Sequence, residues 1–484
     1  MQSPFGNGSP TPLSRRRFLT SAAALGLGTT GLAGALAACS PAERTPQTQA
    51  GQQAQQGQVV NGHYPEDAAK ALNDSLKWPE TVVPEPTEQV EITVAHAWDA
   101  TFMERQKQFD KFFMERHPNI KLTVENTVWG EFQKKYVTAA AGGSLPDLMY
   151  MHFSWIQVFI RQGVFTNLKD YIAKQTDFKL DDFTKPSTVP FVSGGDLYGV
   201  PYDCGPLMLF YNKDLLTKSG IDAPTDDWTM DDLKKAALKV TADGAGKVWG
   251  LAGGPTPGAS DLAPPWLFPF GARYVNDTQT ECLISEPKAV ETMKYWQELR
   301  DAKAIPTPAQ VTAIQPDPFV AGRAAFQLAG TWATPQLQTL ANFEWSMAKW
   351  PSGPVKRSTA AEGSAYAITQ KSKNPDATWI YLNEYISEAG ENFMWASTGR
   401  GSPSRSSAWK YYTESELAAP GADQILPVLN EYGSGEVLYL PQTTKAMDTA
   451  TPIWDQVIAG KKSVEDGLGE ITAALNPILS QNAV

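Results

Sequence analysis

A strand, a helix and a second strand follow one another over residues 90–125, and this order constrains the fold more than any other feature. Residues 90–95 alternate apolar with polar or small side chains, which is the period of a half-buried strand. The helix after it carries four phenylalanines and ends at His117, and another alternating segment begins at Ile120. This order predicts two parallel strands of an open α/β sheet.

The same pattern continues through a helix over 130–141 and an apolar run at 148–151. In open parallel sheets, ligands bind beyond the carboxyl ends of the strands. The residues at those ends are therefore candidates for ligand binding: Trp98 and Asp99 after the first strand, Trp129 after the second, and His152, Ser154 and Trp155 after the third.

Residues 197–221 predict a passage from one lobe to a second. An apolar segment leads through residues 201–206, which are rich in proline and glycine, into a second apolar run and then a helix. A hinge strand of this kind would lie in the floor of a cleft, where Tyr202 and Asp203 could face a ligand. An ordinary buried strand within one domain remains the alternative.

The chain beyond this passage predicts a second lobe. Thr229 and Asp232 have the spacing of a capping box at a helix start, which we favour over a pair of catalytic acids. Trp266 lies among prolines at another helix start, and Trp332 follows a strand predicted at 324–328. A buried tryptophan that caps a helix is the alternative for Trp332.

Two further crossings between the lobes are predicted. We place one at 347–353, after which a strand containing Glu362 and Gly363 returns to the first lobe. The other is the loop that contains Arg400. The predicted lobes are residues 89–202 with 350–396, and residues 203–349 with 397–484.

The N-terminal residues carry an export motif. Residues 14–20, SRRRFLT, match a twin-arginine signal, and a mildly apolar stretch then ends in LAAC, which resembles a bacterial lipobox. We therefore expect residues 1–38 to be a signal peptide and Cys39 to be lipid-modified. The chain would then be anchored at the extracytoplasmic face of the cell membrane.

Residues 39–88 are rich in Gln, Ala, Pro and Thr, which predicts a flexible spacer with a short helix near 65–76. The length of 484 residues suggests two or three domains. A net charge of −11 argues against a nucleic-acid partner. Cys204 and Cys282 could form a disulfide, but a bridge would restrict a hinge, so we expect free thiols.

Several segments together resemble the extracellular solute-binding proteins of carbohydrate ABC importers, the group that contains maltose-binding protein. The resemblance covers nearly all of residues 90–479 and is carried by VEITVAHAWDA at 90–100, FDKFFMERHPNIKLTVE at 109–125, LPDLMYMHFSWIQVFIRQGVFTNL at 145–168, LYGVPYDCGPLMLFYNKDLLTKSGI at 197–221, FVAGRAAFQLAGTW at 319–332 and TGRGSPSR at 398–405. It implies an α/β, two-lobed, periplasmic-binding-protein-like fold of the type II kind, with three hinge crossings.

The resemblance also implies a set of ligand-binding positions, which coincide with the strand-end candidates: Trp98, Asp99, Trp129, His152, Ser154, Trp155, Tyr202, Asp203, Trp266, Trp332, Glu362, Gly363 and Arg400. Gly205 and Met447 stand where maltose-binding protein has an acidic residue and sugar-stacking aromatics, which argues against maltodextrin as the ligand.

The chemistry of these residues suits a sugar. A pyranose has apolar C–H faces and a ring of hydroxyls, so it needs aromatic surfaces together with groups that exchange hydrogen bonds. The chain has 15 tryptophans, several at predicted strand ends. We expect a monomeric protein without a cofactor that captures a di- or oligosaccharide and delivers it unchanged to the permease subunits of an ABC importer. Neutral sugars rank above phosphate esters.

Two alternatives remain open at this point. A secreted glycoside hydrolase or lyase would need two suitably spaced carboxylates, which the many acidic residues allow. However, the sequence shows no nucleophile elbow or zinc-binding histidine pattern, and its four histidines are scattered. A surface lipoprotein with a sensory or structural role would carry the same export motif.

Overall fold

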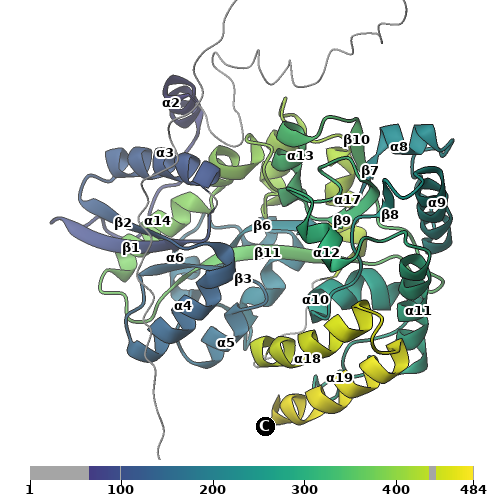
Figure 1. The fold of residues 1–484 in the computed structure, drawn as a ribbon. Coiled ribbons are helices and arrows are strands. Elements are labelled where there is room, and N and C mark those ends of the chain that lie inside the picture. Colours follow the sequence, from purple (N-terminus) through teal and green to yellow (C-terminus); the bar gives the residue numbers. More distant parts are fainter. Residues whose placement is uncertain (1–64, 99, 435–442, 483–484) are drawn as a thin grey trace, which may run out of the picture. The chain divides into compact units, whose positions relative to one another are not determined.

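The computed structural model describes residues 65–98, 100–434 and 443–482, and two β-sheets organise them (Figure 1). The first sheet has the strand order β12-β11-β3-β1-β2, and β6 also pairs with β11. Its strands are β1 (Val90–His96), β2 (Ile120–Asn126), β3 (Leu148–His152), β6 (Val200–Pro206), β11 (Thr359–Ile368) and β12 (Gly433–Ser434).

The predicted β-α-β unit is confirmed. Strand β1 pairs in parallel with β2 from Val90 opposite Ile120 to His96 opposite Asn126, and with β3 on its other side. Strand β11 runs antiparallel to both β3 and β6. The helices of this part are α3 (Ala100–Arg116), α4 (Trp129–Gly142), α5 (Ile156–Arg161), α6 (Lys169–Lys174) and α14 (Pro375–Tyr385).

The second sheet has the order β10-β7-β9-β8, formed by β7 (Met208–Asn212), β8 (Trp249–Leu251), β9 (Ala324–Ala329) and β10 (Trp345–Ala348). Its surrounding helices include α8 (Lys213–Lys218), α9 (Met230–Asp243), α11 (Pro287–Asp301), α18 (Thr443–Ile458) and α19 (Val464–Leu479). The predicted capping box is confirmed, because Thr229 and Asp232 satisfy each other's backbone N–H groups at the start of α9.

The chain passes between the sheets at the first two predicted crossings, with shifted limits. Strand β6 belongs to the first sheet up to Pro206, and β7 of the second sheet begins at Met208, so only Leu207 separates them. The return lies between β10 and β11, over residues 349–358. In the third segment, the Ser402 carbonyl accepts a hydrogen bond from the Cys204 N–H at 3.0 Å. Cys204 and Cys282 are both free and buried.

Residues 65–88, which we call the strap, differ from the expected flexible spacer. The strap contains α2 (Glu66–Ser75) and packs on the first lobe, where Ala69 and Val83 join its hydrophobic core. The Trp78 ring lies 3.9 Å from the guanidinium carbon of Arg116 and 5.8 Å from the Phe109 ring. The polar composition that predicted a spacer extends to the first described residues. Within the strap, Trp78 and its apolar neighbours provide enough apolar surface to pack on the first lobe.

Candidate ligand-binding cleft

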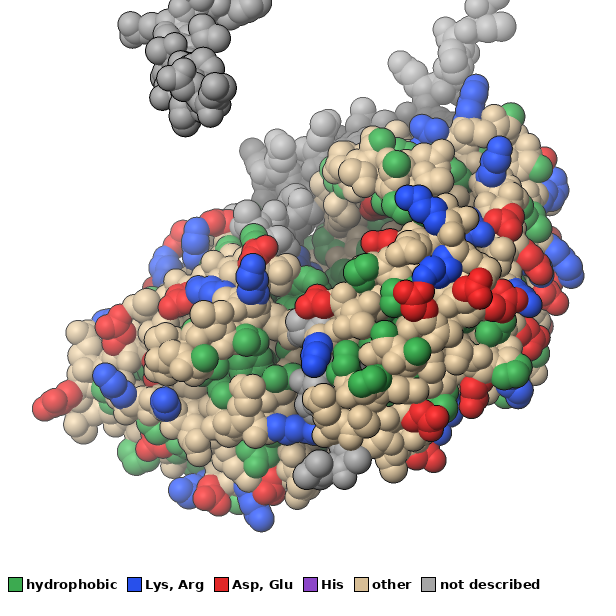
Figure 2. All heavy atoms as spheres, turned by 60° about the horizontal axis from the view of Figure 1, so that its bottom comes forward, with side chains coloured by type: hydrophobic (Ala, Val, Ile, Leu, Met, Phe, Trp, Pro, Cys, Tyr) green, Lys and Arg blue, Asp and Glu red, His purple; other side chains and the backbone are tan. Residues whose placement is uncertain are grey.

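A cavity of about 840 Å³ lies between residues of the two sheets. The face drawn in Figure 2 is hollowed between two groups of elements, with acidic and basic side chains interspersed around it. Eleven of the predicted ligand-binding residues line the cavity: Trp98, Trp129, His152, Ser154, Trp155, Tyr202, Asp203, Trp332, Glu362, Gly363 and Arg400. The carboxyl ends of β1 and β3 therefore bring their strand-end residues together, as in other open sheets.

One wall of the cavity is aromatic. Trp129, at the start of α4, is 51% exposed, and its ring centroid lies 5.1 Å from that of Trp155 and 5.5 Å from that of His152. Trp155 stacks on Phe132 of α4 at 6.1 Å, which holds its indole in place. The wall therefore presents the exposed indole of Trp129 to the cavity, supported by the packed rings of Trp155 and His152.

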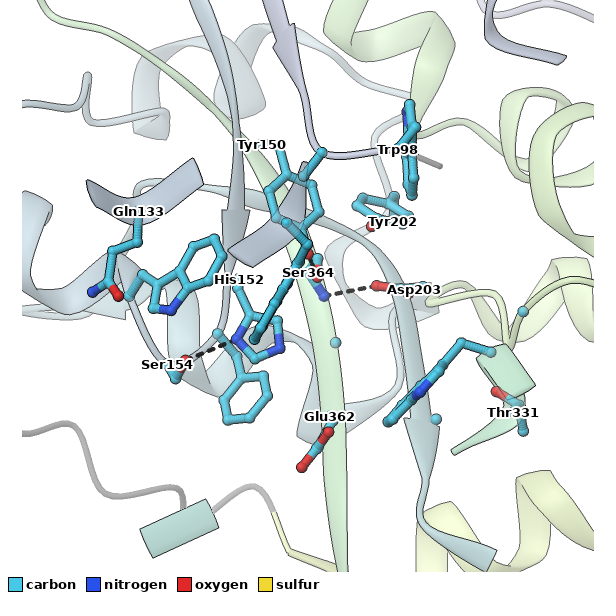
Figure 3. Close-up of a pocket in the computed structure, with 18 of the residues that line it drawn as sticks. Trp98, Gln133, Tyr150, His152, Ser154, Tyr202, Asp203, Thr331, Glu362 and Ser364 are labelled. Carbon is cyan, nitrogen blue, oxygen red and sulfur yellow. Dashed lines mark hydrogen bonds between the residues drawn. The ribbon is translucent and has the colours of Figure 1, made fainter. Parts of the chain in front are cut away.

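The floor consists of packed aromatic rings that are themselves held by polar contacts (Figure 3). The Trp98 ring meets the edges of Tyr150 and Tyr202, and its indole N–H donates to Gln106 at 3.2 Å. The Asn126 side chain accepts from the backbone N–H of Trp98 and donates to its carbonyl. These bonds fix the turn after β1.

The opposite wall comes from the second sheet. Trp332 lies in a short 3₁₀ turn after β9 and is 47% exposed. Its ring lies over Gly330, where a Cβ atom would come within 2.0 Å of it, so a larger residue there would displace the indole. At Gly205 a Cβ atom would approach the Thr331 hydroxyl to 2.8 Å, which explains why the crossing strand has no side chain there.

Two polar side chains of the cavity floor have pKa values that differ from their ordinary values. The Asp203 carboxyl accepts a hydrogen bond of 2.7 Å from the Ser364 N–H, and burial raises its pKa to about 7 although that bond and Arg400 act in the opposite sense. Burial lowers the pKa of His152 to about 3, so its ring is neutral at physiological pH, and its Nδ1 pairs with the Ser154 hydroxyl at 2.8 Å. Both groups can exchange hydrogen bonds with hydroxyls.

Glu362 is a buried carboxyl group at the cavity. Its side chain projects from β11 into the cavity (Figure 3), is 9% exposed, and its Oε1 atom has no hydrogen-bond partner in the described structure. The Asp261 carboxyl lies beside it. Burial first, and then the charge of Asp261 and a hydrogen bond shared with its carboxyl group, raise the pKa of Glu362 well above its usual range.

Two predicted residues are not placed at the cavity. Asp99 lies outside the described residues. Trp266 is 2% exposed in the core of the second lobe, where its ring meets that of Trp350 at 5.2 Å. The proline-rich turn Ala263–Leu267 directs its indole inward, and the sequence pattern does not reveal that direction.

Other cavity residues were not singled out from the sequence: Gln133, Tyr150, Asp261, Ser364, Trp395, Ser402 and Asp448. Tyr150 lies within an apolar run that reads as core, and Asp448 belongs to the distant helix α18. Among the described residues, no group of His, Cys, Asp or Glu is arranged to hold a metal ion, and no helix is long and apolar enough to cross a membrane.

The sequence profile of the family described as bacterial extracellular solute-binding protein matches residues 95–392, more than half of the chain. The chain belongs to this family. The predicted resemblance is therefore confirmed. The family consists of solute-binding proteins, so membership also confirms that this protein is not an enzyme and removes the alternative of a glycoside hydrolase or lyase.

Two relatives illustrate the likeness of this solute-binding protein. It is 28% identical over 307 residues to a binding protein of Brucella abortus, covering 61% of this chain and 71% of the relative. It is 25% identical over 327 residues to the lactose-binding protein of Rhizobium radiobacter, covering 64% of this chain and 74% of the relative.

A solved structure supports the fold of this solute-binding protein. It is the ABC substrate-binding protein Lmo0181 from Listeria monocytogenes in complex with cycloalternan, which superposes with a TM-score of 0.73 at 23% identity over 81% of this chain and 99% of that chain. This likeness confirms the predicted two-lobed α/β fold.

Proposed function

We propose that this solute-binding protein captures a di- or oligosaccharide in the cleft and delivers it to the permease subunits of an ABC importer. The observation that carries the proposal is the pair of half-exposed indoles, Trp129 and Trp332, on opposite walls of one cavity with carboxyl groups between them. Indole faces pack against the C–H faces of a pyranose, and carboxyls accept from its hydroxyls. The relatives named for lactose and for arabinooligosaccharides support a saccharide of this size.

The charges of the cleft favour sugars over phosphate esters. Among the described lining residues, Arg400 is the one basic side chain, and Asp203, Asp261, Glu362 and Asp448 are acidic. Arg405, a further candidate for a phosphate, is buried and its guanidinium lies 3.2 Å from the Asp182 carboxylate. A phosphate would therefore find one cationic partner, Arg400, and would oppose the ionisation of the carboxyl groups around it.

Domain limits and export form part of the same proposal. We propose lobes of residues 89–202 with 350–396 and 203–349 with 397–484, which close on the ligand. The pairing of β12 with β11 draws a short part of the last segment to the first sheet. Residues 1–38 would be the twin-arginine signal peptide and Cys39 the lipid anchor of a monomer at the extracytoplasmic face; both lie outside the described residues.

A thermal-shift screen tests the function directly. A ligand that binds the folded protein raises its unfolding temperature, and the rise grows with the ratio of ligand concentration to dissociation constant. We expect neutral disaccharides and oligosaccharides to raise it and phosphorylated polyols to leave it unchanged; the opposite ranking would refute the proposal.

Replacing either open indole tests the stacking. We expect Trp129→Ala and Trp332→Ala each to weaken sugar binding about tenfold, since losing an aromatic contact of ~1.4 kcal/mol changes a dissociation constant by that factor. Titration by calorimetry measures it. Leu340→Ala, an exposed apolar residue outside the cavity, is the matched control and should bind like the wild type.

A further inference from the structure

Two carboxyl groups meet in the cleft from opposite lobes. Glu362 stands on β11 of the first sheet, and Asp261 belongs to the short helix α10 (Ala259–Leu262) of the second lobe. The Asp261 carboxyl accepts a hydrogen bond of 3.1 Å from the Thr256 hydroxyl. We call Glu362 and Asp261 the carboxyl pair.

The carboxyl pair lies in an acidic environment. The other charged groups that line the cavity are Asp203, Asp448 and Arg400, while His152 is neutral. The Arg400 guanidinium lies over the Phe102 and Trp98 rings, at 4.2 and 5.7 Å, and its charge lowers the pKa of Asp203. The cavity therefore presents more carboxyl groups than its single cation balances.

A buried carboxyl oxygen without a partner is costly, and Glu362 Oε1 is such an atom. It can be satisfied by a proton shared within the pair or by a donor on the ligand. A hydroxyl of a neutral sugar donates one hydrogen bond and carries no charge. An ammonium group donates three and carries the opposite charge, so it can satisfy both carboxyls at once.

We infer that the carboxyl pair, Glu362 with Asp261, is a subsite for a protonated amine, and that the preferred ligand is a saccharide bearing a basic nitrogen. This inference rests on the proposed function and adds the class of sugar. The half-exposed indoles on both walls agree with it, because the face of an indole attracts a cation as well as a C–H surface.

The subsite has a definite proton balance. Without ligand, burial and the Asp261 charge favour the protonated form of Glu362. An ammonium between the carboxyls takes the place of that proton, which leaves to solvent. Binding of an amine therefore releases a proton and weakens as the pH falls, whereas a neutral sugar releases none.

The test compares sugars that differ only in one substituent. The probes are glucosamine with glucose, galactosamine with galactose, and the chitosan disaccharide with cellobiose, together with the N-acetylated form of each amine. Calorimetry on the full-length protein measures each affinity. We expect at least one amine to bind about tenfold more tightly than both its hydroxyl and its N-acetyl counterpart, as a charge-assisted bond replaces a neutral one.

The second readout identifies the residues. In Glu362→Gln the ratio of amine to hydroxyl affinity should fall toward one, and the proton release, measured as the difference in binding heat between two buffers of different ionisation enthalpy, should disappear. Asp261→Asn gives the same comparison if Glu362→Gln does not fold. Glu414→Gln, an exposed carboxyl outside the cavity, is the control and should keep the wild-type ratio.

The outcomes separate the two proposals. Equal or tighter binding of the neutral sugars overturns the amine subsite and leaves the proposed function intact. An amine preference that survives both substitutions overturns the assignment to the carboxyl pair. Failure of every sugar, charged or neutral, to bind overturns both.

Discussion

At the residue scale, several carboxyl groups of the cleft have pKa values above their ordinary range. Burial is the main cause of the raised pKa of both Asp203 and Glu362, and the Arg400 charge opposes the shift at Asp203 without cancelling it. A folded protein keeps such groups where a ligand repays the cost of burying them. These buried carboxyl groups therefore lower the free energy of unfolding of the ligand-free protein, and a bound ligand raises it again.

Asp203 gives a prediction about pH. Its pKa is about 7 in the folded chain and near 3.8 when unfolded, so the folded state holds the extra proton between these values and loses stability as the pH rises through them. The loss amounts to at most about 4 kcal/mol, since one pKa unit is worth about 1.36 kcal/mol. We expect Asp203→Asn, whose amide oxygen can still accept from Ser364, to be more stable than the wild type at pH 8 and similar at pH 4.

Chemical denaturation at the two pH values measures this difference. The buried carboxyls Asp110 and Glu391 also have raised pKa values and give both proteins the same background. Parallel pH profiles for wild type and variant would show that Asp203 is not the titrating group.

At the element scale, the strap shows what sequence patterns capture and what they miss. The alternation of a strand and the signals at a helix end lie in consecutive residues of the sequence. The limits of β1, α3 and β2 could therefore be predicted to within a few residues. The docking of the strap depends on Trp78 meeting Arg116 and Phe109, and contacts between distant segments leave no local pattern. The same reason explains why Asp261 was missed and why the inward direction of Trp266 was not foreseen.

Removing the central side chain of the strap tests its attachment. We expect Trp78→Ala to destabilise the protein by about 2 kcal/mol, below the range for a fully buried tryptophan because Trp78 is only partly buried. Amide exchange of α2 should become fast while that of β1 stays slow. Unchanged protection of α2 would mean that other contacts hold the strap.

His117 adds a pH dependence to the strap. Burial lowers its pKa, but the Glu384 and Glu85 carboxylates, at 2.9 and 2.6 Å, outweigh that effect and raise it. Protonated His117 therefore stabilises the folded protein below the ordinary histidine pKa of about 6.5. This stabilisation is lost as the pH rises through the raised pKa that His117 has in the folded protein. We expect His117→Gln to destabilise the protein more at pH 5.5 than at pH 9, measured by denaturation; an equal effect at both would exclude this linkage.

At the scale of the whole molecule, the family and the two-lobed fold followed from the order of many weak signals along the chain. Each of the quoted segments is only weakly specific for the family by itself. However, the strand ends, the crossing segment and the loop around Arg400 occur in the order along the chain that the fold requires. The site was harder to predict because its two walls come from different sheets. Eleven strand-end and crossing residues do line one cavity, yet the pairing of Glu362 with Asp261 exists only after folding.

The anchor is also a property of the whole chain. We expect Cys39→Ala to move the protein from the membrane fraction to the soluble extracytoplasmic fraction, because a lipid-modified cysteine supplies the membrane affinity. The purified variant should bind sugar as the wild type does. Retention in the membrane fraction would mean that another segment holds it there.

The strap has one more consequence, which concerns movement. It joins the N-terminal side of the chain to the first lobe through Ala69, Trp78 and Val83. The point at which the described chain begins would therefore move with the first lobe when the cleft closes. Capture and release of a ligand would then change the position of the second lobe relative to the strap, and a transport partner that contacts both would distinguish the loaded protein from the empty one.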